Sequence, residues 1–170
     1  MMRLFAVLLS GLFLGTALPL RADLTTAIAG NDPRMQKAIH AARQSLPGML
    51  ATHLPPGSVS TPDFTLKISL PVNSASAQSL GVTDEAIWVE EIAQNGNAFT
   101  GLLANEPDFM PGLTLGEAVT FTRGQIIDWS LQASDGLLYG NFTTRALLAH
   151  RTPEEAAILR QMLSPNPMPN

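Results

Sequence analysis

Alternation of apolar and polar residues predicts three strands that each have one buried face. The apolar positions of the first run are Phe64, Leu66, Ile68 and Leu70. A second run spans 118–122, and the clearest one spans 125–133, with apolar positions at Ile127, Trp129 and Leu131. A period of two puts each apolar set on one side of its strand. The polar residues between them, Asp128 included, therefore face the other way.

Three further runs complete an antiparallel sheet of about five to six strands. Residues 86–92 and 98–104 carry apolar side chains on both faces, so we expect these two strands to be covered on both sides. Asn95-Gly96 stands between them and is a strong signal for a hairpin turn. Residues 137–142 are predicted to return across Asp135-Gly136 and to pair with 125–133.

Helices are predicted at both ends of this strand-rich region. Asp32 is a good N-cap, and Pro33 suits the first position of a helix. The apolar stripe that follows at helical spacing comprises Met35, Ala38, Ile39, Ala42 and Leu46. We expect this helix to cover the sheet and to break or kink at Pro47-Gly48. Segments 146–150 and 153–163 supply one or two C-terminal helices, so the fold class is α+β.

Residues 1–22 have the layout of a secretory signal peptide. Arg3 precedes an apolar run that ends near Leu18, and the small residue Ala22 follows. A transmembrane helix needs about 20 apolar residues, and this run is shorter. We therefore expect cleavage after Ala22, or after Ala17, and a periplasmic or secreted bacterial protein that no membrane anchor retains.

The remaining chain is predicted to be one domain over 23–163, followed by a disordered tail at 164–170. Within the domain, the small and polar segment 73–84 is predicted to be a mobile connection. The chain has no cysteine, which excludes disulfides, thiol catalysis, cysteine-based zinc sites and lipid anchoring through an N-terminal cysteine. Stability must therefore come from packing alone.

The charge of the chain disfavours two classes of partner. Loss of Arg3 and Arg21 with the leader leaves 8 basic residues against 14 acidic ones, a net charge of −6 with histidine neutral. A negative chain without a cluster of basic residues is a poor match for nucleic acid or for an anionic membrane. The sequence has no glycine-rich phosphate loop, G-x-S-x-G or H-E-x-x-H motif, and its three histidines are far apart, so no cofactor or metal site is predicted.

The order of motifs is itself distinctive. The chain contains F-x-G-x-L-x-N-E-P, then G-L-x-x-G-E-x-V-x-F, I-x-D-W and G-N-F-T-x-R. Over roughly 34–149 it resembles the YegJ-like family, the bacterial domain of unknown function 2314. The matching positions are Trp88, Val89, Phe99, Gly101, Asn105, Glu106, Pro107, Gly116, Val119, Phe121, Ile127, Asp128, Trp129, Gly140, Thr143 and Arg145. The insertion of small residues at 73–83 departs from the family pattern. The resemblance implies a compact α+β fold and often export, and it implies no established reaction.

Five polar or aromatic residues in this dense region are the candidates for a site: Trp88, Asn105, Glu106, Asp128 and Arg145. A structural interpretation has Glu106 tying a loop and Asp128 pairing with Arg145, because the hairpin across Asp135-Gly136 brings Arg145 back toward Asp128. A functional interpretation makes the same residues a binding or catalytic site. Trp88 and Trp129 lie on apolar-rich strands, which favours core positions over ligand platforms.

Three functions remain open, and the lack of catalytic motifs favours the first. The first is a non-catalytic binding module for a protein or cell-envelope component, which uses a sheet face or the 105–117 loop. The second is a hydrolase-like enzyme that uses Glu106 and Asp128, with Arg145 as the partner of an anion. The third is an immunity or inhibitor-type protein that neutralises a basic effector through its negative charge.

Overall fold

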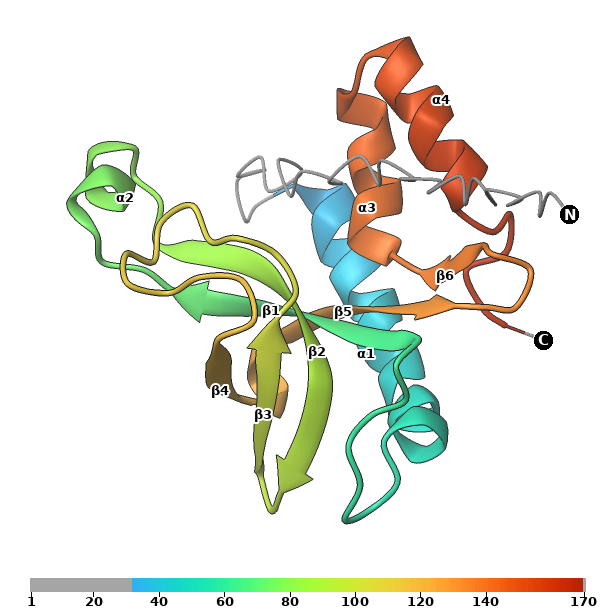
Figure 1. Ribbon diagram of the computed structural model, residues 1–170. Coiled ribbons are helices and arrows are strands. Elements are labelled where there is room, and N and C mark those ends of the chain that lie inside the picture. The colour runs from blue at the N-terminus through green and yellow to red at the C-terminus, as the bar shows by residue number, and fades with distance from the viewer. Residues whose placement is uncertain (1–31, 170) are drawn as a thin grey trace, which may run out of the picture.

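The structure is a computed structural model that describes residues 32–169, so the predicted signal peptide lies outside the described residues. One sheet of six antiparallel strands has the order β4-β3-β2-β1-β5-β6 (Figure 1). The strands are β1 Phe64–Pro71, β2 Asp84–Asn95, β3 Ala98–Leu103, β4 Ala118–Thr122, β5 Ile126–Gln132 and β6 Leu138–Gly140. The helices are α1 Pro33–His53, α2 Ala75–Ser79, α3 Phe142–Leu147 and α4 Pro153–Met162, with the short 3-10 helices η1 Arg123–Gln125 and η2 Leu148–His150. The predicted α+β class is confirmed. No helix within 32–169 is both long enough and apolar enough to cross a membrane.

Helix α1 covers one face of the sheet, as the sequence predicts. The side chain of Asp32 accepts a hydrogen bond of 2.8 Å from the backbone N–H of Arg34, which caps the helix. Of the break or kink predicted at Pro47-Gly48, the break is wrong, because α1 continues through Pro47 to His53. Proline removes one helical hydrogen bond, but Met49 and Leu50, which follow it, are buried in the core. Their packing holds the last turns of the helix in place.

Trp129 stands in the centre of the layer between α1 and the sheet. Its side chain is fully buried, and its indole Nε1 donates a hydrogen bond of 2.9 Å to Oγ of Ser45 on α1. The core position predicted for Trp129 is therefore confirmed. Gly140 crosses beside it with a φ of +69°, and a Cβ at Gly140 would collide with the carbonyl and ring of Trp129. Only glycine fits at this crossing.

Irregular pairing changes which residues of two strands reach the core. Lys67 on β1 pairs with Asp128, but the next residue, Ile68, pairs with Ile126, so Ile127 is the extra residue of a bulge. Ile126 is consequently buried, whereas Ile127, the predicted core residue, is half-buried. Strand β3 also differs from the prediction, because its residues alternate between buried and more exposed positions instead of being covered on both sides.

Two connections also differ from their predictions. Asn95 pairs with Ala98, so the two-residue turn between β2 and β3 is Gly96-Asn97 and not Asn95-Gly96. The segment 73–84, predicted to be a mobile connection, contains the short helix α2. Oγ of Ser74 accepts from the N–H of Ala77, and Ala77 is fully buried. A cap and one buried methyl group thus order a segment whose composition is typical of loops.

The chain after β5 turns into helix earlier than the sequence predicts. Strand β6 ends at Gly140, because Asn141 takes a left-handed conformation with a φ of +53° and Phe142 begins α3. The predicted disorder of the tail is wrong as far as Pro167. Ser164 N–H donates to the carbonyl of Leu138, and Gly140 N–H donates to the carbonyl of Pro167, at 3.0 and 2.7 Å. The tail therefore pairs with the outer edge of β6.

Candidate functional site

Three polar or aromatic residues form a row across the face of the sheet that lies opposite α1, which we call the outer face. Strand β1 lies between β2 and β5, and Lys67 on β1 is paired with Trp88 on one side and with Asp128 on the other. Directly paired residues share one face of a sheet. The Trp88–Lys67–Asp128 row therefore brings together two of the predicted site residues and adds one that the sequence analysis did not select.

Lys67 is the cation at the centre of this row. Its side chain is only 4% exposed, and its ammonium group lies 5.2 Å from the centre of the Trp88 ring. Burial lowers the pKa of Lys67, the carboxylate of Asp128 opposes that change, and the guanidinium of Arg151 adds to it. Among residues 32–169, no hydrogen bond or ion pair uses the ammonium of Lys67. The Trp88 ring and the charge of Asp128 both compensate for the water that the ammonium group loses.

Asp128, on strand β5, caps the N-terminus of helix α3. Its Oδ1 accepts hydrogen bonds from the N–H groups of Trp129 and Phe142, at 2.9 and 3.1 Å. Its Oδ2 accepts from the N–H and the hydroxyl of Thr143, at 2.7 and 2.6 Å. The residue that precedes α3, Asn141, makes no side-chain cap. Asp128 thus performs the task of an N-cap, because it satisfies the first N–H groups of the helix.

The four donors around Asp128 determine its charge. The side chain is 1% exposed, and burial raises its pKa, while the hydrogen bonds from Thr143 and the charge of Lys67 oppose the rise. Each carboxylate oxygen accepts two hydrogen bonds, and these bonds favour the ionised form. The charge of Lys67 beside it favours the same form.

The predicted ion pair between Asp128 and Arg145 is not formed. The guanidinium of Arg145 donates instead to three backbone carbonyls, those of Gly140, Ser164 and Leu138. Asp128 affects the pKa of Arg145 through its charge alone, and burial, the larger effect, lowers that pKa. Arg145 therefore joins β6 to the C-terminal tail, while Asp128 binds backbone N–H groups of α3.

Asn105 and Glu106 stabilise the loop that follows β3. Oδ1 of Asn105 accepts from the N–H of Trp88 at 2.9 Å, and Oε2 of Glu106 accepts from the N–H of Leu115 at 3.2 Å. The buried Glu85, which the sequence analysis did not select, accepts from the N–H groups of Asp108 and Phe109. Asn105 lies beside the Trp88 backbone and so borders the row. The contact of Glu106 is that of a loop residue.

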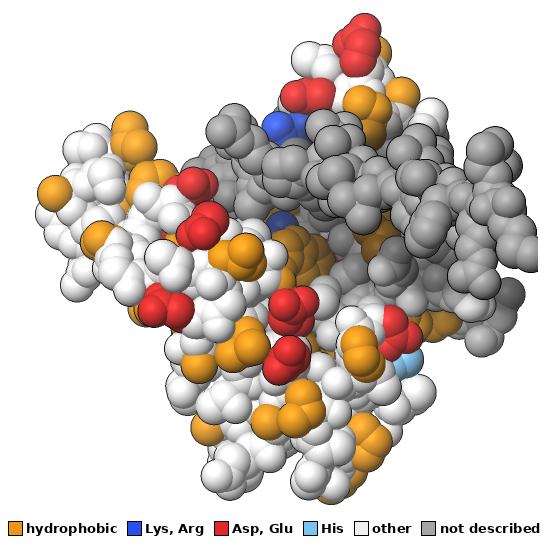
Figure 2. Space-filling model, in the orientation of Figure 1, with side chains coloured by type: hydrophobic (Ala, Val, Ile, Leu, Met, Phe, Trp, Pro, Cys, Tyr) orange, Lys and Arg blue, Asp and Glu red, His pale blue; other side chains and the backbone are white. Residues whose placement is uncertain are grey.

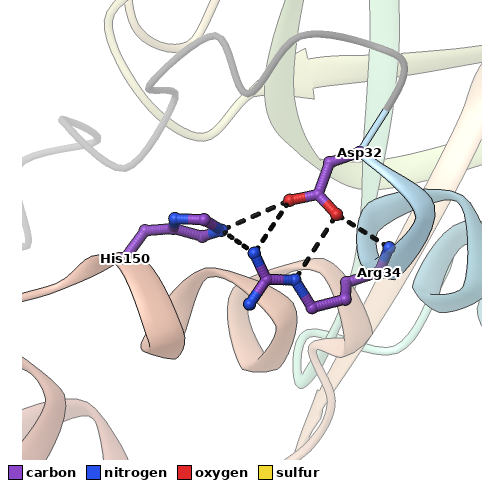
Figure 3. Close-up of polar contacts among 3 residues, drawn as sticks. All are labelled: Asp32, Arg34 and His150. Atoms are coloured by element: carbon purple, nitrogen blue, oxygen red, sulfur yellow. Dashed lines mark hydrogen bonds and ion pairs between the residues drawn. The ribbon is translucent and has the colours of Figure 1, made fainter.

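A second polar cluster joins the start of α1 to η2 (Figure 3). Oδ2 of Asp32 lies 3.3 Å from Nε2 of His150 and 3.4 Å from the guanidinium of Arg34. The same guanidinium is 2.9 Å from Nε2 of His150, so the three side chains contact one another. Over 32–169, no group of three or more acidic or histidine side chains could hold a metal ion. We assign this cluster to the packing of η2 against α1.

Comparison with known proteins places the chain among bacterial domains. The model of the family described as an uncharacterized protein conserved in bacteria, DUF2314, matches residues 32–163. The chain belongs to the DUF2314 family. The match begins at the N-cap of α1 and ends just after α4, so every described helix and strand lies inside it.

Two curated relatives match about half of the chain. A Neisseria meningitidis serogroup B protein, whose name describes it as an ankyrin repeat protein (NMB1133/NMB1171), is 34% identical over 71 residues. That segment is 42% of this chain and 28% of the relative. The uncharacterized protein YegJ of Escherichia coli K12 is 28% identical over 79 residues, 46% of this chain and 51% of YegJ. The matched segments thus cover about half or less of each relative. No solved structure matches.

The cap on α3 generates the first prediction. Asp128→Ala removes the acceptor of four hydrogen bonds and leaves the charge of Lys67 buried without its partner. We expect the free energy of unfolding to fall by about 3–5 kcal/mol. Amide hydrogen exchange at Phe142 and Thr143 should accelerate more than exchange in β1. Urea denaturation and exchange mass spectrometry measure the two effects.

Asp135→Ala is the matched control, because Asp135 is exposed, lies on the same hairpin and accepts two hydrogen bonds, from the N–H of Leu137 and the hydroxyl of Tyr139. This substitution should cost about 1–2 kcal/mol, since each such bond contributes about 1 kcal/mol. Equal losses in the two variants would contradict the role given to Asp128.

The buried lysine generates a prediction about pH. Because the pKa of Lys67 is lowered in the folded state, the unfolded chain binds this proton more tightly. The stability of the wild type, relative to Lys67→Met, should therefore rise with pH from the lowered pKa up to the ordinary lysine value of 10.5, and should be independent of pH below that window. Urea midpoints measured across this range test the sign. A difference between the wild type and Lys67→Met that does not change with pH would refute the prediction.

Proposed function

We propose that this domain is a non-catalytic binding module whose outer face recognises an anionic group, such as a carboxylate, on a protein or cell-envelope component. The observation that carries the proposal is Lys67, whose side chain is 4% exposed beside Trp88 and whose ammonium group donates no hydrogen bond within 32–169. An ammonium group has three N–H donors, and each is costly to bury without an acceptor. A carboxylate that arrives over Trp88 would supply these acceptors.

The neighbours of Lys67 favour an anion over a cation. Arg151 is near enough to affect the pKa of Lys67, and Arg145 is near enough to interact with Asp128. Asp128 is the one acidic residue of the row, and its oxygens are fully occupied by the donors of α3 and by its own strand. Trp88 is half-buried and offers a ring face at the border of the row. Aromatic rings next to a cation are common features of binding surfaces.

The geometry gives less support to the hydrolase-like alternative. Asp128 is on β5, whereas Glu106 follows β3, and strands β2 and β1 lie between β3 and β5. Acid and base groups act together when a substrate can reach both of them. In addition, each oxygen of Asp128 already accepts two hydrogen bonds, and the guanidinium of Arg145 donates to carbonyl oxygens. These contacts of Asp128 and Arg145 are those of residues that hold the backbone in place beneath a binding surface.

The surface charge favours a second candidate, an immunity or inhibitor-type protein that binds a basic effector. Figure 2 shows more Asp and Glu than Lys and Arg side chains on the face that it draws. Glu90, Glu91, Glu106 and Asp108 are exposed on β2 and on the loop after β3. A surface of this kind attracts a basic partner and makes its association rate sensitive to salt.

We also propose that the protein is exported and that residues 1–22 are removed, which would place the domain in the periplasm or outside the cell. The support is the layout of the leader, with Arg3 ahead of an apolar run and Ala22 after it. Mass spectrometry of the protein purified from its own cells measures the N-terminus directly. We expect a chain that starts at Asp23, or at Leu18. An intact Met1 would refute export by this route.

The binding proposal predicts that Lys67→Met abolishes capture of a partner from cell-envelope extract. Methionine keeps the apolar length of the side chain and removes the charge, so the fold should survive. The captured partner is then titrated against both proteins by calorimetry, and we expect its affinity for Lys67→Met to fall at least about tenfold, the loss typical of a buried charged contact. Affinity should also fall when carboxylates of the partner are esterified.

Lys37→Met is the matched control, because Lys37 is the other lysine of the chain and is exposed on α1. This variant should bind the partner with unchanged affinity. A partner that binds Lys67→Met normally, and is lost instead from a Glu90→Gln/Glu106→Gln variant, would favour the inhibitor-type candidate. Equal binding to every variant would defeat both candidates.

A further inference from the structure

One edge of the sheet is covered by the C-terminal segment, and the other edge is not. Strand β6 has the C-terminal segment along its outer edge, with hydrogen bonds from Ser164 N–H to Leu138 and from Gly140 N–H to Pro167. Strand β4 is the other edge, and in the part of the chain that the structure describes no strand lies beyond it. An uncovered edge is a template on which another strand can pair.

The register identifies which groups of β4 point outward. Leu103 N–H donates to the carbonyl of Glu117, and residues two apart along an antiparallel pair repeat that pattern. Val119 and Phe121 therefore bond to β3, and the N–H and C=O groups of Ala118, Thr120 and Thr122 point away from the sheet. The N–H of Thr122 is already bound to Oε1 of Gln125 at 2.9 Å.

The sequence of β4 has none of the features that prevent edges from pairing. Ala118–Thr122 reads AVTFT, with no proline, no lysine and no charged residue. Val, Thr and Phe are good strand formers, and β4 contains no bulge in its pairing with β3. Natural edge strands are usually interrupted by charges or proline. The β4 edge is thus suited to pairing.

We propose that β4 pairs with β4 of a second copy of this chain, antiparallel and centred on Thr120. In this arrangement Thr120 pairs with Thr120 of the other copy, and Ala118 pairs with Thr122 of the other copy. Thr120 would exchange two hydrogen bonds with its counterpart, and each Ala118 N–H would donate to the carbonyl of Thr122 opposite. These four bonds leave the contact between Thr122 and Gln125 in place. The result is one continuous sheet through both copies.

Charge complementarity singles out this occupant and this register. Glu117 and Arg123 flank β4 at equal distances from Thr120, and both side chains are exposed. The proposed pairing places Glu117 of each copy opposite Arg123 of the other. A two-fold interface is self-complementary by symmetry, so one such pair necessarily occurs twice. A shift of register by one or two residues loses both contacts.

The absence of cysteine from the chain allows a direct test of the axis. Thr120→Cys places two thiols across the two-fold, where hydrogen-bonded antiparallel residues have Cα atoms about 5.5 Å apart. A short dithiol-reactive crosslinker should convert most of this variant to a covalent dimer. Thr100→Cys is the control, because Thr100 is exposed on the same face but lies on β3, inside the sheet. Equal crosslinking of the two variants, or none of Thr120→Cys, would overturn the proposal.

Sedimentation equilibrium of the full chain, as the cell processes it, tests the interface without crosslinking. We expect a dimer that Thr120→Lys converts to a monomer, since two lysines would then face each other on the axis. Glu117→Arg should weaken the dimer about tenfold by setting arginine against Arg123 at both ends, and Glu117→Arg/Arg123→Glu should restore it. Circular dichroism and urea midpoints confirm that each variant is folded. A native protein that stays monomeric, or a dimer that Thr120→Lys leaves intact, would overturn the pairing.

Discussion

The buried carboxylate of Asp128 connects strand β5 to helix α3, the first of the C-terminal helices. An ionised group inside a protein is tolerated only when donors and opposite charge replace its lost water. Here the donors are two backbone groups and one hydroxyl of α3 together with the N–H of Trp129, and the opposite charge is Lys67. Helix α3 can begin only where these groups meet the carboxylate. From that starting point the chain continues into η2 and α4.

Asp128 and Trp129 are adjacent, and they join β5 to two different elements. Asp128 binds the first turn of α3, while Trp129 reaches Ser45 on α1 and meets the ring of Phe142 edge-on. Helices α1 and α3 also pack against each other. Two consecutive residues of one strand therefore fix the relative placement of three elements. Gly140 completes this junction, because it lets β6 pass the tryptophan without a side chain.

The sequence predicted the elements better than it predicted the contacts between them. Alternation located β1, β4 and β5 because each has one apolar face, and it identified Trp129 as a core residue. The bulge that moves Ile127 out of the core depends on pairing with β1, which no local pattern encodes. Asp128 was selected correctly, but Arg145 was expected to be its partner. Most of its real partners are backbone N–H groups, and a sequence does not indicate which of these will lie near a side chain. Lys67 was not selected because it lies among the polar positions of β1, which alternate with the apolar ones. Residues at such positions are usually exposed to solvent.

The tail that pairs with β6 has a consequence for the order in which the molecule can be completed. A ribosome delivers the chain from its N-terminus, so α1 and strands β1 to β6 are available before Ser164 and Pro167. Until those two residues arrive, the N–H of Gly140 lacks its acceptor, the carbonyl of Pro167, and the carbonyl of Leu138 lacks the hydrogen bond from Ser164. Arg145, whose guanidinium binds the carbonyl of Ser164, must wait for the same residues. Residues 164–167 thus complete the pairing along β6, and the outer edge of that strand is covered only after they have been synthesised.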